Sequence, residues 1–144
     1  AVIYKVDSEN IDSMTFIRNS NTTSNPETIV NQQLEAYNNK DIDAFTYTYS
    51  ENIKLYSFPD TLNSDGQEAI KKGYTSFFNS VPDLNAEIVN RIVIGNMVID
   101  KEKVLINGKI YYAIAIYEVE NELISRVTLV ASLKKFGVSL QLAL

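Results

Sequence analysis

The chain has 144 residues, a length typical of one domain with one core, and its 45% hydrophobic and 22% charged residues are ordinary for a globular protein. A net charge of −5 with scattered Lys and Arg argues against a nucleic-acid or anionic-membrane partner, and no apolar run reaches the roughly 18 residues of a membrane span. The absence of Cys and His excludes disulfides, thiol nucleophiles, Ser-His-Asp triads and zinc sites of the usual kind.

The first 24 residues read as an extension outside the compact domain. Alternation of Val2, Tyr4 and Val6 in AVIYKV predicts a short strand, whereas RNSNTTSN at 18–25 is polar and predicts a linker. We therefore expect an N-terminal extension and polar linker over 1–24, with the compact domain beginning at Asn25. The chain begins with Ala rather than Met, which fits a cleaved signal peptide or a trimmed chain, so cytoplasmic and exported locations both stay open.

Two helices are predicted to follow. Asn25, Pro26 and Glu27 start the first, because Asn caps the first turn, Pro suits its first position and Glu faces the positive end of the helix dipole. Residues 38–40, Asn-Asn-Lys, end this helix, and Asp41 caps a second, shorter one.

A strand, a loop and a third helix come next. NIKLYSF at 52–58 predicts the strand, and PDTLNSDG at 59–66 predicts the loop. Asp65 followed by Glu68 forms a capping-box pattern for a helix at about 66–80.

The rest of the chain predicts four strands in an antiparallel meander. Gly95-Asn96, Asn107-Gly108 and the weaker Asn121-Glu122 separate them, and Asn-Gly is a strong hairpin signal. Helices followed by such a meander indicate an α+β fold. The tail at 134–144 could add an edge strand.

Two-residue hairpins also fix which residues face each other. The first turn places Arg91 opposite Asp100, and the second places Glu102 opposite Ala113. One sheet face then carries two carboxylates, an arginine, a tyrosine and two small residues: Arg91, Asp100, Glu102, Ala113, Ala115 and Tyr117. Such a set is typical of the wall of a polar-bottomed pocket.

The opposite sheet face is strongly apolar. It carries Ile92, Ile94, Met97, Ile99, Ile114 and Ile116. The helices can cover only one face. If they cover the isoleucines, the carboxylates lie outside; if they cover the carboxylates, the isoleucines need a partner, most simply the sheet of a second copy. Both arrangements stay open here.

Five segments carry a family resemblance: QLEAYNNKDIDAF (33–45), FP (58–59), DGQEAIKKGY (65–74), VNRIVIGNMVIDKEKV (89–104) and AIYEVENELISRV (115–127). Residues 26–133 resemble the nuclear transport factor 2-like superfamily, in its SnoaL-like or steroid delta-isomerase-like subgroup. The resemblance implies a SnoaL-like domain at 25–133 with a cystatin-like fold, a cone-shaped curved antiparallel sheet covered by three N-terminal helices.

The resemblance does not carry the isomerase residues onto this chain. Ketosteroid isomerases use an Asp before a Pro as general base, a Tyr of the first helix and a second Asp in a late strand. The matching positions here hold Phe58, Gln33 and Ala115. Limonene-epoxide hydrolase, of the same superfamily, uses Asp, Arg and Asp to activate water, which is similar in type to Arg91, Asp100 and Glu102.

Arg91, Asp100 and Glu102 are therefore the candidate catalytic residues. Arg91 and Asp100 could form only a cross-strand salt bridge. Alternatively, Arg91 keeps Asp100 ionised while Glu102 has a raised pKa, which gives one pocket an acid and a base. Simple solvent exposure is the third reading. The candidate substrate-binding residues are aromatic and could equally belong to the core: Tyr37, Tyr56, Phe58, Tyr74, Phe78 and Tyr117.

The sequence thus predicts a domain that binds a small apolar molecule, without metal or organic cofactor. It leaves open whether the domain is an enzyme for proton transfer or water addition, a binding protein without chemistry, or a module that forms a homodimer through the sheet or binds another protein.

Overall fold

The computed structural model describes residues 2–7, 10–16 and 25–131. Three helices and a six-stranded sheet form the body of the chain, so the predicted α+β fold is confirmed. None of the described helices is long and apolar enough to span a membrane. The tail predicted as an edge strand lies outside the described residues.

The first two helices begin where their caps predict. Helix α1 (Pro26–Asn39) has the side chain of Asn25 accepting a hydrogen bond from the backbone N–H of Glu27 at 2.9 Å. It ends at Lys40, which adopts a left-handed conformation with φ 55°. Helix α2 (Ile42–Tyr47) is capped by Asp41, which accepts from the backbone N–H of Ala44 at 3.0 Å.

The start of helix α3 (Gln67–Ser80) differs from the prediction. The residue before the helix is Gly66, and no side chain caps it, so the predicted capping box is wrong. Asp65 is instead the last residue of strand β4 (Thr61–Asp65) and pairs with Lys54 of strand β3 (Tyr49–Ser57) at 2.7 Å. The segment predicted as a loop therefore contains an edge strand.

The sheet has the order β4-β3-β8-β7-β6-β5. The last four strands are β5 (Asn85–Ile94), β6 (Met97–Ile106), β7 (Lys109–Glu120) and β8 (Leu123–Ala131). These four form the predicted antiparallel meander, but β3 runs parallel to β8, which makes the sheet mixed.

The two tight turns set the predicted register. Arg91 pairs with Asp100 across β5 and β6, and Glu102 pairs with Ala113 across β6 and β7. At the β6–β7 turn, Asn107 and Gly108 both have positive φ, and their backbone N–H groups donate to the carboxylate of Asp83.

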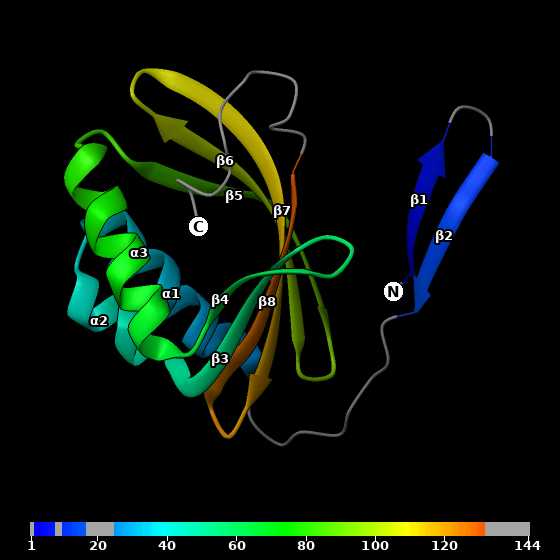
Figure 1. Cartoon of the computed structure of the whole chain (residues 1–144), viewed down its shortest axis with the longest axis horizontal. Helices are drawn as coiled ribbons and strands as arrows, with labels where there is room; N and C mark the ends of the chain where they lie inside the picture. Colours follow the sequence, from blue (N-terminus) through cyan, green and yellow to red (C-terminus); the bar gives the residue numbers. More distant parts are fainter. Residues whose placement is uncertain (1, 8–9, 17–24, 132–144) are drawn as a thin grey trace.

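The three helices cover the sheet face that carries the carboxylates. Figure 1 shows them on one side of the sheet, which curves around them. The core between the two layers includes Phe45, Ile70, Val98 and Tyr117, all buried. The isoleucine face is therefore the outer face, and several of its side chains are exposed: Ile92 51%, Ile110 54%, Tyr112 54% and Ile114 38%.

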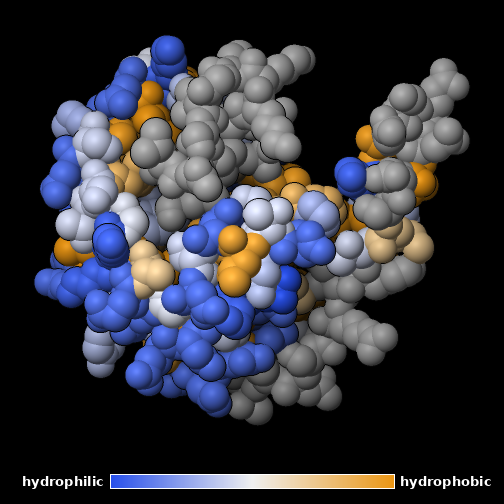
Figure 2. All heavy atoms as spheres, in the orientation of Figure 1, coloured by the Kyte–Doolittle hydropathy of each residue, from blue (hydrophilic) through white to orange (hydrophobic). Residues whose placement is uncertain are grey.

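The N-terminal region contains a β-hairpin. Strand β1 (Val2–Asp7) confirms the strand predicted in AVIYKV, and it pairs with a second strand, β2 (Asn10–Phe16). Figure 2 shows apolar side chains on this hairpin, at the right of the view; Val2, Tyr4 and Val6 are all exposed.

Asn38 joins the end of helix α1 to strand β5 through two hydrogen bonds. Its side-chain amide donates to the carbonyl of Ala86 at 2.9 Å, and its carbonyl accepts from the N–H of Ala86 at 2.7 Å. We predict that Asn38→Ala lowers the free energy of unfolding by roughly 1–3 kcal/mol, because two hydrogen bonds are lost and both backbone groups lose a partner. Urea denaturation measures this change. Asn39→Ala, at an exposed position one residue later, should stay within about 0.5 kcal/mol; an equal loss in both variants would contradict the prediction.

Candidate functional site

A cavity of about 60 Å³ lies between the helices and the inner face of the sheet. It has room for roughly four to six water-sized groups. Helices α1 and α3 form one wall, and strands β3 and β5–β8 form the other. Its lining comprises Gln33, Leu34, Tyr37, Tyr49, Leu55, Tyr74, Ala86, Glu102, Val104, Ile106, Tyr111, Ala113, Tyr117, Val127 and Leu129.

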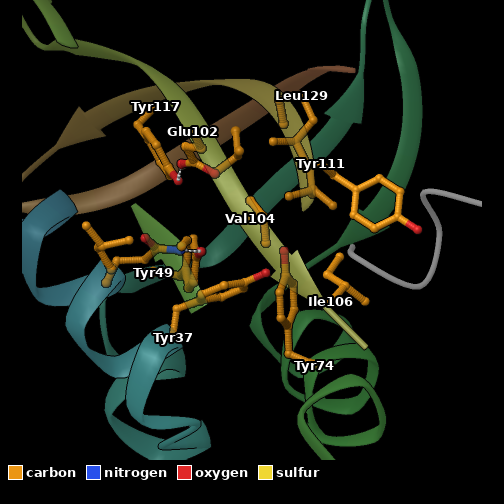
Figure 3. A pocket seen from close by; sticks show the side chains of 15 residues that line it. Tyr37, Tyr49, Tyr74, Glu102, Val104, Ile106, Tyr111, Tyr117 and Leu129 are labelled. Atoms are coloured by element: carbon orange, nitrogen blue, oxygen red, sulfur yellow. Dashed lines mark hydrogen bonds between the residues drawn. The ribbon is translucent and has the colours of Figure 1, made fainter. Parts of the chain in front are cut away.

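Glu102 is the acidic residue in this lining. It projects from β6 into the cavity because Ala113, opposite it on β7, is too small to cover it. The hydroxyl of Tyr117 donates a hydrogen bond to Oε1 of Glu102 at 3.0 Å, as Figure 3 shows. The pKa of the Glu102 carboxyl is raised from 4.5 to about 7, chiefly by burial. The hydrogen bond from Tyr117 and the charge of Arg91 oppose this shift, and the charge of Asp100 adds to it.

Asp100 is on the same strand but has a different environment. It is 1% exposed and does not line the cavity. Arg91 donates two parallel hydrogen bonds to Asp100, from Nε to Oδ1 and from Nη2 to Oδ2, and both are 2.7 Å long. The same guanidinium donates to Oδ1 of Asn31 at 2.6 Å and lies 3.5 Å from Glu27, so it ties helix α1 to the sheet.

Of the six predicted aromatic residues, three line the cavity and three do not. Tyr37 and Tyr74 point into it from α1 and α3, with their hydroxyl ends toward the strand that carries Val104, and Tyr117 enters from β7. The remaining three residues lie elsewhere. Phe78 packs in the aromatic core, Tyr56 lies on the outer face under Arg126, with the guanidinium 4.1 Å from its ring centre, and Phe58 is only partly buried and outside the lining.

Sequence reasoning missed Tyr49 and Tyr111 as cavity residues. Tyr49 is the first residue of β3, and its hydroxyl accepts a hydrogen bond from Nε2 of Gln33 at 3.0 Å. Tyr111 shares a face with Ala113 and Tyr117 on β7, so strict alternation along that strand could have identified it.

Four of the tyrosine hydroxyls in the cavity, those of Tyr37, Tyr49, Tyr74 and Tyr117, stay protonated near neutral pH. Burial raises the pKa of Tyr37, Tyr49, Tyr74 and Tyr117, and in each case the charge of Glu102 adds to the shift. Glu102 is therefore the group in this lining that changes charge around pH 7. The described residues contain no cluster of three or more Asp or Glu side chains that could hold a metal ion.

Residues 30–127 match the model of the SnoaL-like domain, so this chain belongs to the SnoaL-like family. No curated protein matches the chain.

Solved structures share the fold at low sequence identity. An uncharacterised cystatin-fold protein from Novosphingobium aromaticivorans has a TM-score of 0.70 and 20% identity, over 74% of this chain and 97% of that one. A nuclear transport factor 2-like protein from Cytophaga hutchinsonii has a TM-score of 0.66 and 18% identity, over 79% of this chain and 96% of that one. An LEH-like epoxide hydrolase from M. tuberculosis has a TM-score of 0.66 and 13% identity, over 76% of this chain and 84% of that one. Others carry the names ketosteroid isomerase and polyketide cyclase. These likenesses establish the fold and no activity.

The raised pKa of Glu102 predicts a pH-dependent stability difference. Between about pH 4.5 and 7 the folded protein holds a proton that the unfolded chain has released, so stability falls as the pH rises through this window. The free energy of unfolding of Glu102→Gln minus that of the wild type should therefore be higher at pH 8 than at pH 4, by roughly 1–3 kcal/mol. Urea denaturation of both proteins at the two pH values measures the difference. The matched control is Glu87→Gln, which carries the same change on the outer face; a pH-independent difference for Glu102→Gln would refute the assignment.

Proposed function

We propose that this chain is a small-molecule-binding domain of the SnoaL-like type, with Glu102 as the ionisable contact of its ligand. The observation that carries the proposal is the half-buried carboxyl of Glu102, held by Tyr117 at the wall of a largely apolar cavity. The volume of about 60 Å³ suits a ligand of roughly four to six non-hydrogen atoms.

Proton transfer through Glu102 is the chemistry that this arrangement favours. A carboxyl with a pKa of about 7 can both take and return a proton near neutral pH. Water addition with two carboxylates and an arginine is less well supported, because Asp100 and Arg91 are bound to each other and lie outside the cavity lining. If Glu102 transfers no proton to or from the bound molecule, the domain binds its ligand without catalysing a reaction.

Ligand binding is tested by NMR titration with fragments of four to six non-hydrogen atoms. We expect the signals of Tyr37, Val104 and Ala113 to shift, and Glu102→Gln to change the affinity for at least one fragment, while Glu87→Gln does not. If no fragment shifts these signals, the cavity is not a ligand site. Each fragment that binds is then incubated in D₂O to follow deuterium incorporation at carbon. Incorporation that falls by about 10²- to 10⁴-fold in Glu102→Gln supports catalysis, and its absence in wild type leaves binding without chemistry.

A second candidate function is homodimerisation through the outer face of the sheet. Four large side chains of strands β5 and β7 are at least 38% exposed there: Ile92, Ile110, Tyr112 and Ile114. Large apolar side chains exposed together on one sheet face are typical of an interaction site. Lys101 and Lys103 of β6 lie beside Ile114 and Tyr112 on the same face.

Sedimentation velocity at micromolar concentration tests this second function. We expect a dimer for the wild type and a monomer for Ile114→Lys, because the substitution would bury a charge in each half of a symmetric interface. Tyr47→Lys is the matched control, since Tyr47 is 82% exposed on helix α2, away from the outer face. A wild-type monomer would contradict the proposal.

A further inference from the structure

We propose that the cavity binds a small organic cation, an alkylammonium with a short apolar body, and that its charged nitrogen lies against Glu102. This inference rests on the proposed small-molecule site and names the chemical class of its ligand.

The cavity lining has a negative charge that no cationic side chain of the lining balances. This lining contains one carboxyl group and no Lys or Arg. The cation that acts on Glu102 electrostatically is Arg91, and this residue already neutralises Asp100 through two hydrogen bonds of 2.7 Å. The ionised carboxylate of Glu102 therefore has no positive partner among the described residues. Buried charges in proteins are normally paired, and a cationic ligand would supply the missing partner.

Several oxygen atoms in the cavity are available as hydrogen-bond acceptors for a ligand. Oε1 of Glu102 accepts from Tyr117, but within the described part of the chain its second oxygen has no hydrogen-bond partner. The same holds for the hydroxyls of Tyr37 and Tyr74, whose ends point toward the strand that carries Val104 (Figure 3). An ammonium has three N–H donors and needs such acceptors. Tyrosine rings add attraction for a cation that reaches their faces.

The rest of the lining suits a short hydrocarbon. Aliphatic side chains form the remaining wall: Leu34, Leu55, Val104, Ile106, Val127 and Leu129. A cavity of about 60 Å³ accommodates n-butylammonium, with its five non-hydrogen atoms, at roughly one water-sized volume for each atom.

Other ligand charges fit less well. An anion would be repelled by Glu102 and would find no cation in the lining. An uncharged molecule with an acceptor oxygen would use the tyrosine hydroxyls and the protonated form of Glu102. The pH dependence separates this case from a cation, because an acceptor binds best below the pKa of Glu102 and a cation binds best above it.

The pH dependence can be assigned to Glu102 because the groups facing it do not titrate in the same range. They are Tyr37 of α1, Tyr49 of β3, Tyr74 of α3 and Tyr117 of β7, whose pKa values burial raises. The charged neighbours Arg91 and Asp100 are bound to each other by two hydrogen bonds of 2.7 Å. An alkylammonium, like a Lys side chain with a pKa near 10.4, stays charged throughout.

The experiment compares n-butylammonium, 1-butanol and butanoate by NMR titration of the full chain at about pH 6 and pH 8. We expect n-butylammonium to bind at least tenfold more tightly than 1-butanol at pH 8, to lose most of this advantage at pH 6, and to outcompete butanoate at both. The advantage should vanish in Glu102→Gln, which can still accept from Tyr117, and persist in Glu87→Gln. Thermal unfolding confirms that both variants are folded.

Each other outcome overturns the inference in a recognisable way. If 1-butanol binds as tightly as n-butylammonium at pH 8, the cavity remains a small-molecule site but not a cation site. If butanoate binds more tightly than the other two, the charge inventory of the cavity is wrong. If n-butylammonium binds equally to wild type and Glu102→Gln, the cation lies elsewhere. If none of the three shifts the signals of the lining residues, the cation inference fails, whereas the proposed function fails only if the fragments of the earlier titration also leave these signals unchanged.

Discussion

The site depends on the alternation of side chains along β5, β6 and β7. Side chains on a strand alternate between the two faces, so a shift of one residue would move Glu102 to the outside. The turns at Gly95-Asn96 and Asn107-Gly108 prevent that shift, and the second is reinforced by Asp83, which accepts from both of its backbone N–H groups. The face thus defined places a carboxylate beside an alanine under the helices.

Two carboxylates on one strand acquire different roles from their neighbours. Asp100 meets a guanidinium that fits both of its oxygens, so its charge is neutralised within the structure. Glu102, two residues along, meets Ala113 and a tyrosine hydroxyl. Desolvation then dominates, and its ionisation moves to a pH at which small changes in the surroundings alter its charge. A carboxyl group is therefore a structural anchor at Asp100, whereas at Glu102 it has a pKa of about 7 and lines the cavity.

Much of this arrangement follows from local sequence patterns. The helix caps at Asn25 and Asp41, the hairpin turns and the pairing of Arg91 with Asp100 are all confirmed, because each depends on residues close in the chain or on a two-residue turn. The face that the helices cover could not be predicted, since it depends on contacts between α1, α3 and strands far away in sequence.

Contacts between separate segments also explain the two places where the structure differs from the sequence-based prediction. The pairing of Asp65 with Lys54, which makes β4 a strand rather than part of a loop, forms between separate segments. Tyr56 lies on the outer face because β3 aligns with β8, and nothing near Tyr56 in the sequence specifies that alignment.

Helix α1 is attached to strand β5 near both of its ends. Arg91 reaches Asn31 and Glu27 near the start of the helix, and Asn38 forms a pair of hydrogen bonds with Ala86 near its end. Lifting α1 from the sheet would break all of these contacts at once. Helix α3, which brings Tyr74 to the same cavity, is held at its start by Gln67, whose side-chain amide donates to the carbonyls of Thr46 at 3.1 Å and Tyr49 at 2.9 Å. The two attachments of α1 therefore keep the helical wall of the cavity at a fixed distance from the strand wall that contains Ala86.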